Sequence, residues 1–130
     1  MLRAPGTNQL YIAAAKGLSP DIAEGTQIHI GQGVAGKVAL SREPLLVTDV
    51  AQAVNHPLLG DEYFTTGSFI SFPIVYHDDL VGVLNLTNRI QRGVFVEEDV
   101  ERVRLLALVI SLVASQAELA TKLREPIGAR

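Results

Sequence analysis

Two runs of strand-forming residues, separated by a short polar turn and followed by one long helical pattern, constrain the fold of this chain most. The runs cover residues 68–75 and 80–88 and are rich in Ile, Val, Leu and Phe, whereas His77, Asp78 and Asp79 favour a turn between them. The sequence therefore predicts an antiparallel hairpin.

Shorter elements are expected upstream, where Pro and Gly separate apolar segments. Strands are predicted at residues 10–15, 27–30 and 45–48, and a short helix at residues 34–40. Residues 50–67 contain Asn, Pro and Gly between short apolar or aromatic pieces, which indicates a loop with helical turns over one face of the sheet.

The last helix is predicted to begin at Glu97 and end at Arg124. Acidic Glu97, Glu98 and Asp99 fall in its first turn and basic Lys122 and Arg124 in its last, as the helix dipole favours. Such a helix is about 42 Å long, which is more than a small sheet can cover.

Apolar residues of this helix fall into two adjoining stripes. The first stripe comprises Val103, Leu106, Ile110, Val113, Ala117 and Ala120, and the second comprises Leu105, Leu108, Leu112, Leu119 and Leu123. One stripe is enough to pack on a sheet, so the second predicts contact with another chain. We expect a homodimer that forms through residues 105–123, and a helix end that leads to a downstream output domain.

The composition excludes several classes of function. The 130 residues fit one domain and include no cysteine, which rules out disulfides, thiol nucleophiles and thiolate metal sites. The net charge is -3 and the 11 basic residues are dispersed, so nucleic-acid binding is not expected. No apolar run approaches the roughly 20 residues of a membrane span, so we expect a cytoplasmic protein without membrane insertion.

No catalytic or metal-binding constellation stands out. The three histidines lack metal-ligand spacing, except that His77 precedes Asp78 and Asp79 in what reads as a solvated turn. Neither a serine with a plausible histidine base nor paired carboxylates on one face nor a Walker-type motif is present. We therefore predict that the chain is not an enzyme and carries no cofactor.

The glycine-rich stretch Gly31-x-Gly33-x-x-Gly36 matches the dinucleotide fingerprint. It lies between a predicted strand and a predicted helix, and Asp49 ends the next strand. A dinucleotide-binding enzyme fragment is thus one alternative. Against it, the helix is short and the chain continues into an antiparallel hairpin, so the glycines are expected to form a tight turn that lets the helix approach the sheet.

Asn85 is the most suggestive single residue. By strand alternation it shares a face with Val81, Val83 and Thr87. An asparagine among valines needs hydrogen-bond partners if it is buried. Two interpretations remain open: the side chain bonds to the covering loop, or it recognises a polar ligand.

Hydroxyl and aromatic side chains near this position suit an apolar pocket with a few polar anchors. Ser68 and Ser71 lie on the neighbouring strand, and Phe64 and Phe69 add aromatic surface. The alternative is that the hydroxyls only cap turns at strand ends. The candidate ligand-binding residues are Asn85, Ser71, Ser68, Thr87, Phe64, Phe69 and Asp49.

Several of these segments, in this order, resemble a GAF domain. The resemblance rests on the glycine-rich stretch 31–39, the segment 44–50, and Asn88 followed at the spacing of the family by Phe95 and Asp99. In cyclic-nucleotide phosphodiesterases the last motif reads Asn-Lys, Phe and Asp-Glu, whereas here arginine replaces the lysine and valine the terminal acid.

The resemblance covers residues 10–123 and implies a GAF/PAS-like α+β fold. A central antiparallel sheet would carry the long C-terminal helix on one face and a loop-covered pocket on the other, with residues 50–67 as the lid. One domain over residues 1–125 would precede a tail or linker at 126–130. Relative to the family it lacks the N-terminal helix and most of the first strand, which predicts one uncovered sheet edge.

The resemblance also implies a function. GAF domains are sensory modules of signal-transduction proteins, including two-component systems, and the position equivalent to Asn85 contacts the ligand in cyclic-nucleotide modules. We expect a regulatory module that binds a small molecule, with a cyclic nucleotide as one candidate, and relays a dimer rearrangement to an attached output domain. GAF modules that attach a bilin or reduce free methionine sulfoxide use cysteine, which this chain lacks. A pure dimerisation module without a ligand is the alternative.

Overall fold

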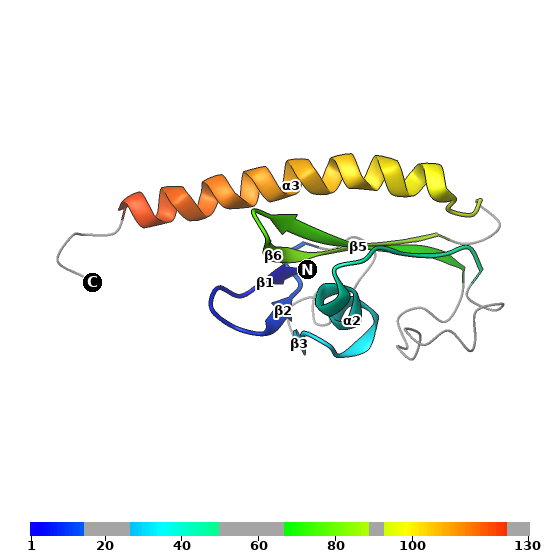
Figure 1. The fold of residues 1–130 in the computed structure, drawn as a ribbon, viewed down its shortest axis with the longest axis horizontal. Coiled ribbons are helices and arrows are strands. Elements are labelled where there is room, and N and C mark those ends of the chain that lie inside the picture. Colours follow the sequence, from blue (N-terminus) through cyan, green and yellow to red (C-terminus); the bar gives the residue numbers. More distant parts are fainter. Residues whose placement is uncertain (15–26, 50–66, 89–92, 125–130) are drawn as a thin grey trace.

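The computed structural model describes residues 1–14, 27–49, 67–88 and 93–124. Figure 1 shows an antiparallel sheet with the long helix α3 across one face and the short helix α2 against the other. This arrangement confirms the α+β fold predicted from the sequence.

Within the described residues the sheet has six strands in the order β3-β2-β1-β6-β5-β4, and every neighbouring pair is antiparallel. The strands are β1 (Leu2–Arg3), β2 (Gln9–Tyr11), β3 (Gln27–His29), β4 (Leu45–Val47), β5 (Ser68–Tyr76) and β6 (Asp79–Asn88). The helices are α2 (Gly33–Ser41) and α3 (Glu97–Arg124). These elements lie close to their predicted positions, although the strand expected at residues 10–15 already ends at Tyr11.

The predicted hairpin is formed by β5 and β6. Its two turn residues, His77 and Asp78, have φ angles of 49° and 65°. Positive φ at both central positions is the geometry of a type I′ turn, whose twist matches that of the flanking strands. Tyr76 and Asp79 therefore face each other at the end of the ladder.

A β-bulge interrupts this hairpin between Ile74 and Val75. Opposite this step the register passes from Gly82 to Leu80, so Val81 is the extra residue and the alternation of faces changes there. Val81 packs on the α3 side of the sheet and Val83 on the α2 side. The expectation that Val81 shares a face with Asn85 is therefore wrong, because it assumed uninterrupted alternation.

Strand β1 is short but lies in the interior of the sheet. It pairs with β2 on one side and with β6 on the other, and the amide of Val83 donates to the carbonyl of Met1 over 2.8 Å. Gly82 permits this approach, since a Cβ there would lie 2.1 Å from the Met1 carbonyl oxygen. The uncovered edge expected from a shortened first strand is thus not observed at β1, because two residues suffice to bridge β2 and β6.

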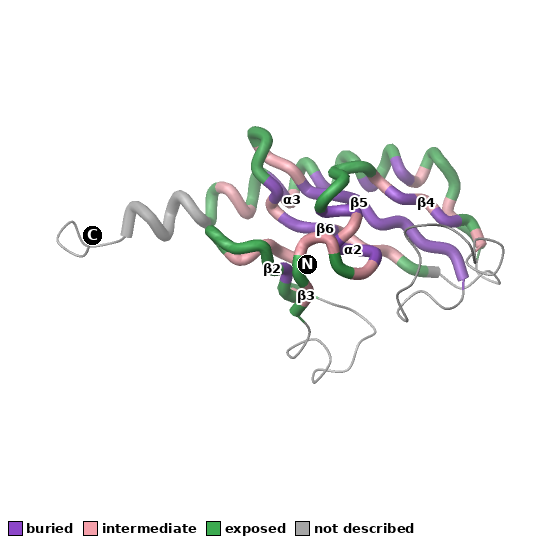
Figure 2. The backbone as a smooth tube through the Cα atoms, turned by 60° about the horizontal axis from the view of Figure 1, so that its bottom comes forward, coloured by how far each residue is buried: buried purple, intermediate pink, exposed green. Residues whose placement is uncertain are grey.

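Each face of the sheet carries its own hydrophobic core. The α2-side core consists of Leu10, Val34, Ala35, Val38, Ala39, Leu45, Val47, Phe69, Leu80 and Val83. The α3-side core consists of Ile70, Phe72, Ile74, Val100, Val103 and Ala107. Strand β5 contributes to both, and Figure 2 shows it buried along most of its length. Full burial of one such large side chain stabilises a fold by about 1.5–3 kcal/mol.

Helix α3 has 28 residues, as predicted, and extends past the hairpin end of the sheet (Figure 1). Its start is fixed by Asp99, whose carboxylate accepts a hydrogen bond of 2.8 Å from the amide of Val96. No helix in the described part of the chain is both long and apolar enough to cross a membrane.

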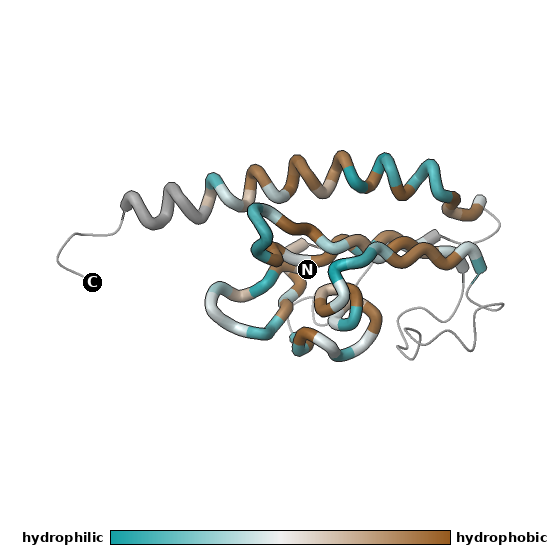
Figure 3. Tube along the Cα trace, viewed as in Figure 1, coloured by the Kyte–Doolittle hydropathy of each residue, from teal (hydrophilic) through white to brown (hydrophobic). Residues whose placement is uncertain are grey.

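The sheet-facing side of α3 differs from both predicted stripes. Val100, Val103, Ala107 and Ser111 are buried against the sheet. Leu106 and Val113, which belong to the same predicted stripe as Val103, are instead 47% and 61% exposed. The middle of the helix is apolar on nearly all sides (Figure 3), so periodicity alone does not identify the face that packs.

Candidate functional site

Asn85 and Ser71 form a polar pair across β5 and β6. The two residues are direct partners in the hairpin register, and the Ser71 hydroxyl donates to Asn85 Oδ1 over 2.7 Å. Ser71 is fully buried and Asn85 is half-buried. The amide group of Asn85 makes no side-chain hydrogen bond to any other described residue, so its nitrogen can still donate to a ligand or to water.

This polar pair lies on the α2 side of the sheet. The alternation of β5 and β6 places Phe69, Val83 and Thr87 on the same face. Phe69 is fully buried in the α2-side core, and Thr87, its partner in register, is exposed. The face therefore changes from dry core to solvent near Asn85, which is where a polar ligand could meet an apolar wall.

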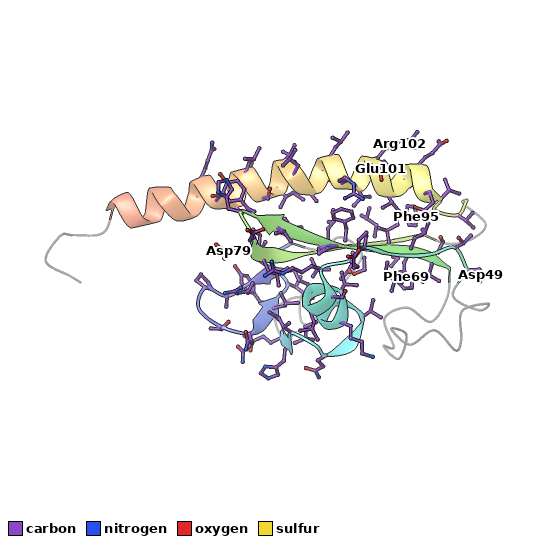
Figure 4. The ribbon with its side chains drawn as sticks, viewed as in Figure 1. Asp49, Phe69, Asp79, Phe95, Glu101 and Arg102 are labelled. Carbon is purple, nitrogen blue, oxygen red and sulfur yellow. The ribbon has the colours of Figure 1, made fainter. Side chains whose placement is uncertain are left out.

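Asp49 follows β4 and is half-buried. Figure 4 shows Asp49 and Phe69 toward the end of the sheet opposite the β5–β6 turn, where Thr87 also lies by register. The structure thus brings Asn85, Ser71, Thr87 and Phe69 together on one face of the sheet, whereas Asp49 lies farther along, two residues beyond Val47, the register partner of Phe69. Phe64 and most of the predicted lid at residues 50–67 lie outside the described residues, so their part in a pocket stays a prediction.

Ser68 is separated from this group, because the alternation of β5 turns it toward α3. Its buried hydroxyl donates to the carbonyl of Val47 over 3.0 Å and accepts from the amide of Phe95 over 2.9 Å. The side chain joins β4, β5 and the segment that leads into α3. Sequence reasoning grouped Ser68 with the ligand residues and gave no indication of its partner Phe95, which is distant in the chain.

The glycine-rich stretch uses its backbone groups internally. The amide of Gly31 donates to the carbonyl of Gly36 over 2.7 Å, and the amide of Gln32 donates to the carbonyl of His29 over 2.9 Å. A phosphate cradle needs such amides to be free. In addition, none of the strand pairs in the described part of the sheet is parallel, so the geometry gives the dinucleotide alternative no support.

No group of three or more His, Asp or Glu side chains in the described residues could hold a metal ion. Two acids near the start of α3 instead form contacts within the helix. Asp99 caps the helix and forms an ion pair of 3.1 Å with Arg102, and Glu101 forms one of 3.3 Å with Arg104. These exposed pairs stabilise the helix only slightly.

Comparison with solved structures finds the same fold in GAF domains. The GAF domain of the Acinetobacter phosphoenolpyruvate-protein phosphotransferase is 22% identical, with a TM-score of 0.71 over 88% of this chain and 67% of that one. The second GAF domain of DevS from Mycobacterium smegmatis is 18% identical, with a TM-score of 0.72 over 94% and 81%. Identities this low establish the fold alone.

A third similar structure is fRMsr of Staphylococcus aureus in complex with its substrate, which is 27% identical with a TM-score of 0.57 over 80% of this chain and 63% of that one. This chain therefore spans about two thirds of the length of that protein and of the Acinetobacter domain. No curated protein sequence matches it. The sequence profile of the GAF domain family matches residues 2–113, which is most of the chain, and the protein therefore belongs to the GAF domain family.

Proposed function

We propose that this GAF domain is a regulatory module that signals by pairing its α3 with the α3 of a second copy. The observation that supports this proposal is an apolar surface on the side of α3 that faces away from the sheet. We call it the α3 stripe; it consists of Leu105, Leu106, Leu108, Val109, Leu112 and Val113, which are 44–68% exposed.

The α3 stripe has the spacing of a helix interface. Its members recur at intervals of three and four residues, which places them on one side of the helix over more than two turns. Contiguous apolar patches of several hundred Å² on a soluble domain mark interaction sites. A second copy fits because the same stripe on both chains is self-complementary about a twofold axis.

The position of the α3 stripe also suits a relay. The stripe lies on the helix that continues past the sheet to residue 124, which is where a following domain would attach. A change in how two α3 helices pack would move both helix ends together. An attached output domain would then respond to the state of the dimer.

A second proposal, favoured by the Asn85–Ser71 pair, is that the module binds a small molecule on the α2 side of the sheet. The amide nitrogen of Asn85 has no acceptor among the described residues and can donate to a ligand oxygen, while its oxygen accepts from Ser71. Cyclic mono- and dinucleotides are the first compounds to screen. We propose a regulatory rather than a catalytic role, since the chain contains no cysteine for the thiol chemistry of reductases.

Analytical ultracentrifugation over a micromolar concentration range tests the dimer. We expect the wild-type chain to dimerise and Leu105→Glu to be monomeric, because a buried unpaired carboxylate opposes association. Leu40→Glu is the matched control, since Leu40 on α2 is 68% exposed, as is Leu105. A wild-type chain that stays monomeric throughout, or a Leu40→Glu variant as disruptive as Leu105→Glu, would contradict the proposal.

A further inference from the structure

The outer side of α3 carries a regular pattern that extends beyond the α3 stripe at both ends. Its residues alternate at intervals of four and three along the helix, and they are Glu98, Arg102, Leu105, Val109, Leu112 and Gln116. All six are exposed, and Figure 4 shows Arg102 on the side of α3 that faces away from the sheet. The sequence continues the same spacing at Leu119 and Leu123.

This alternation is the heptad repeat of a coiled coil, in which positions a and d face the partner helix. Arg102, Val109 and Gln116 fall at a, and Glu98, Leu105 and Leu112 fall at d. The other members of the α3 stripe flank this seam at positions e and g. The residues that α3 buries against its own sheet, namely Val100, Val103, Ala107 and Ser111, fall at the remaining positions b, c and f. The helix can therefore pack on the sheet and on a partner helix at once.

The apolar layers of the seam favour one kind of assembly. Val109 at position a lies between Leu105 and Leu112 at position d. A β-branched residue at a with leucine at d is the combination that favours two parallel strands over three or four. The partner that fits this seam is a second copy of α3 that runs in the same direction.

Gln116 places a polar amide in the seam directly after the apolar layers. In a parallel pair without a shift, Gln116 lies opposite its own copy, and each amide offers both a donor and an acceptor to the other. A shift by one heptad would set Gln116 against Val109, which leaves the amide unpaired in an apolar layer. An antiparallel pair would separate the two glutamines to opposite ends of the interface. Only the parallel pair in register satisfies both amides with each other.

The charged residues at the other end of the seam oppose this arrangement only weakly. A parallel pair sets Arg102 and Glu98 each opposite its own copy. The Arg102 side chain is 75% exposed and forms an ion pair of 3.1 Å with Asp99 of the same chain. Water and the neighbouring carboxylate screen the repulsion between two such arginines. The close contact between the helices therefore begins at Leu105.

We propose that Gln116 sets the register of the α3 dimer, which is a parallel two-stranded coiled coil in which the two Gln116 amides pair with each other. The inference rests on the proposed dimer and specifies how its two helices are aligned. A single polar residue at an a position fixes the register at a cost in stability. Replacement of Gln116 by an apolar residue should therefore tighten the dimer and, at the same time, permit other alignments.

Two singly substituted chains report the register. Leu105→Cys and Leu112→Cys chains are mixed, allowed to exchange partners and mildly oxidised, and the linked peptides are identified by mass spectrometry. In the proposed register each cysteine links only to its own copy, because Leu105 and Leu112 of the two chains are about 10 Å apart along the axis. A disulfide bridges no more than roughly 7 Å between Cα atoms. A shift by one heptad would align the two positions and produce the mixed link.

Substitutions of Gln116 test its role. With Gln116→Val in both chains we expect the mixed link to appear, whereas Gln116→Asn, which keeps an amide, should retain the single register. Gln116→Val alone should also lower the dissociation constant of the dimer in sedimentation experiments by about 10-fold. Gln9→Val is the matched control, since it makes the same change at an exposed glutamine on β2 and should alter neither measurement.

Three results would overturn the assignment of Gln116 while leaving the dimer intact. They are a mixed link in chains that retain Gln116, no mixed link after Gln116→Val, and a dimer that Gln9→Val tightens as much as Gln116→Val does. A wild-type chain that remains monomeric in the same sedimentation experiments would instead overturn the proposed function together with this inference. Circular dichroism of each variant establishes that it is folded.

Discussion

Ser68 shows how one buried hydroxyl can connect three elements. Its hydroxyl donates to the carbonyl of Val47 and accepts from the amide of Phe95, and both groups lose this partner if the hydroxyl is removed. We expect Ser68→Ala to lower the free energy of unfolding by about 1–3 kcal/mol, the cost of unpaired buried polar groups. Urea denaturation measures this loss of unfolding free energy. The exposed Ser41, whose hydroxyl contacts only neighbouring backbone, provides the control Ser41→Ala, and equal losses in both variants would refute the role of Ser68.

Asn85 allows stability and recognition to be tested separately. Asn85→Leu removes the acceptor of the buried Ser71 hydroxyl and should cost about 1–3 kcal/mol in unfolding free energy. Asn85→Asp keeps an acceptor for Ser71 but replaces the amide donor. If cyclic mono- or dinucleotides raise the melting temperature of the wild type, they should no longer do so for Asn85→Asp. A retained shift in that variant would show that the donor of Asn85 is not used.

The sequence placed Ser71 and Asn85 on neighbouring strands, but their direct contact was not accessible from it. A two-residue turn at His77 and Asp78 alone would place Ser71 opposite Leu84, and the bulge shifts the register by one residue so that Ser71 faces Asn85. The position of Val81 was not accessible, because the bulge that shifts it leaves no clear signal in an apolar run. The hydrogen bond from the amide of Phe95 to Ser68 could not be predicted from the sequence either, because only the packing of α3 brings these two residues together.

At the scale of elements, Gly36 sets the distance between α2 and the preceding turn. A Cβ at this position would lie 2.6 Å from the carbonyl oxygen of His29, a backbone atom that cannot move aside alone. We therefore expect Gly36→Ala to destabilise the fold, although the same change in an exposed helix stabilises it by about 1 kcal/mol. Thermal unfolding measures this effect. Lys37→Ala, at the next and half-exposed position of α2, should change stability by no more than about 0.5 kcal/mol, and a neutral or stabilising Gly36→Ala would contradict the close-approach argument.

The length of α3 could be predicted from its charged ends, but the face that packs on the sheet could not. Large apolar side chains surround its middle, so the widest stripe is not the buried one. The buried face is marked by Ala107 and Ser111, small residues that let the helix approach the sheet. A search of the helix for the side with the smallest residues, rather than for the most hydrophobic side, would have identified this face.

At the scale of the whole molecule, the architecture followed from the hairpin and the helix, whereas the order of the strands did not. Strand β1 has two residues and no recognisable strand pattern, yet it connects the two halves of the sheet. Its place depends on Gly82, whose missing side chain lets the backbone of Met1 approach. Such non-local complementarity is not encoded in local periodicity.

The direction of the proposed dimer can be determined because the chain has no cysteine of its own. A relay to two attached output domains requires both α3 helices to leave the dimer at the same end, so we expect a parallel pair. In that arrangement Leu105 lies opposite its own copy, and Leu105→Cys should form a disulfide-linked dimer under mild oxidation. In an antiparallel pair centred on Val109 the two positions would be about 12 Å apart along the axis, beyond the roughly 7 Å between Cα atoms that a disulfide can bridge.

Non-reducing gel electrophoresis distinguishes these arrangements. Leu40→Cys, at an equally exposed leucine outside the α3 stripe, reports random collision and should remain largely monomeric. A variant that carries both Leu105→Cys and Val113→Cys adds the complementary test, since an antiparallel pair aligns these two positions with each other. Efficient cross-linking of this double variant, together with none in Leu105→Cys alone, would establish the antiparallel arrangement and exclude a relay in which both helix ends leave side by side.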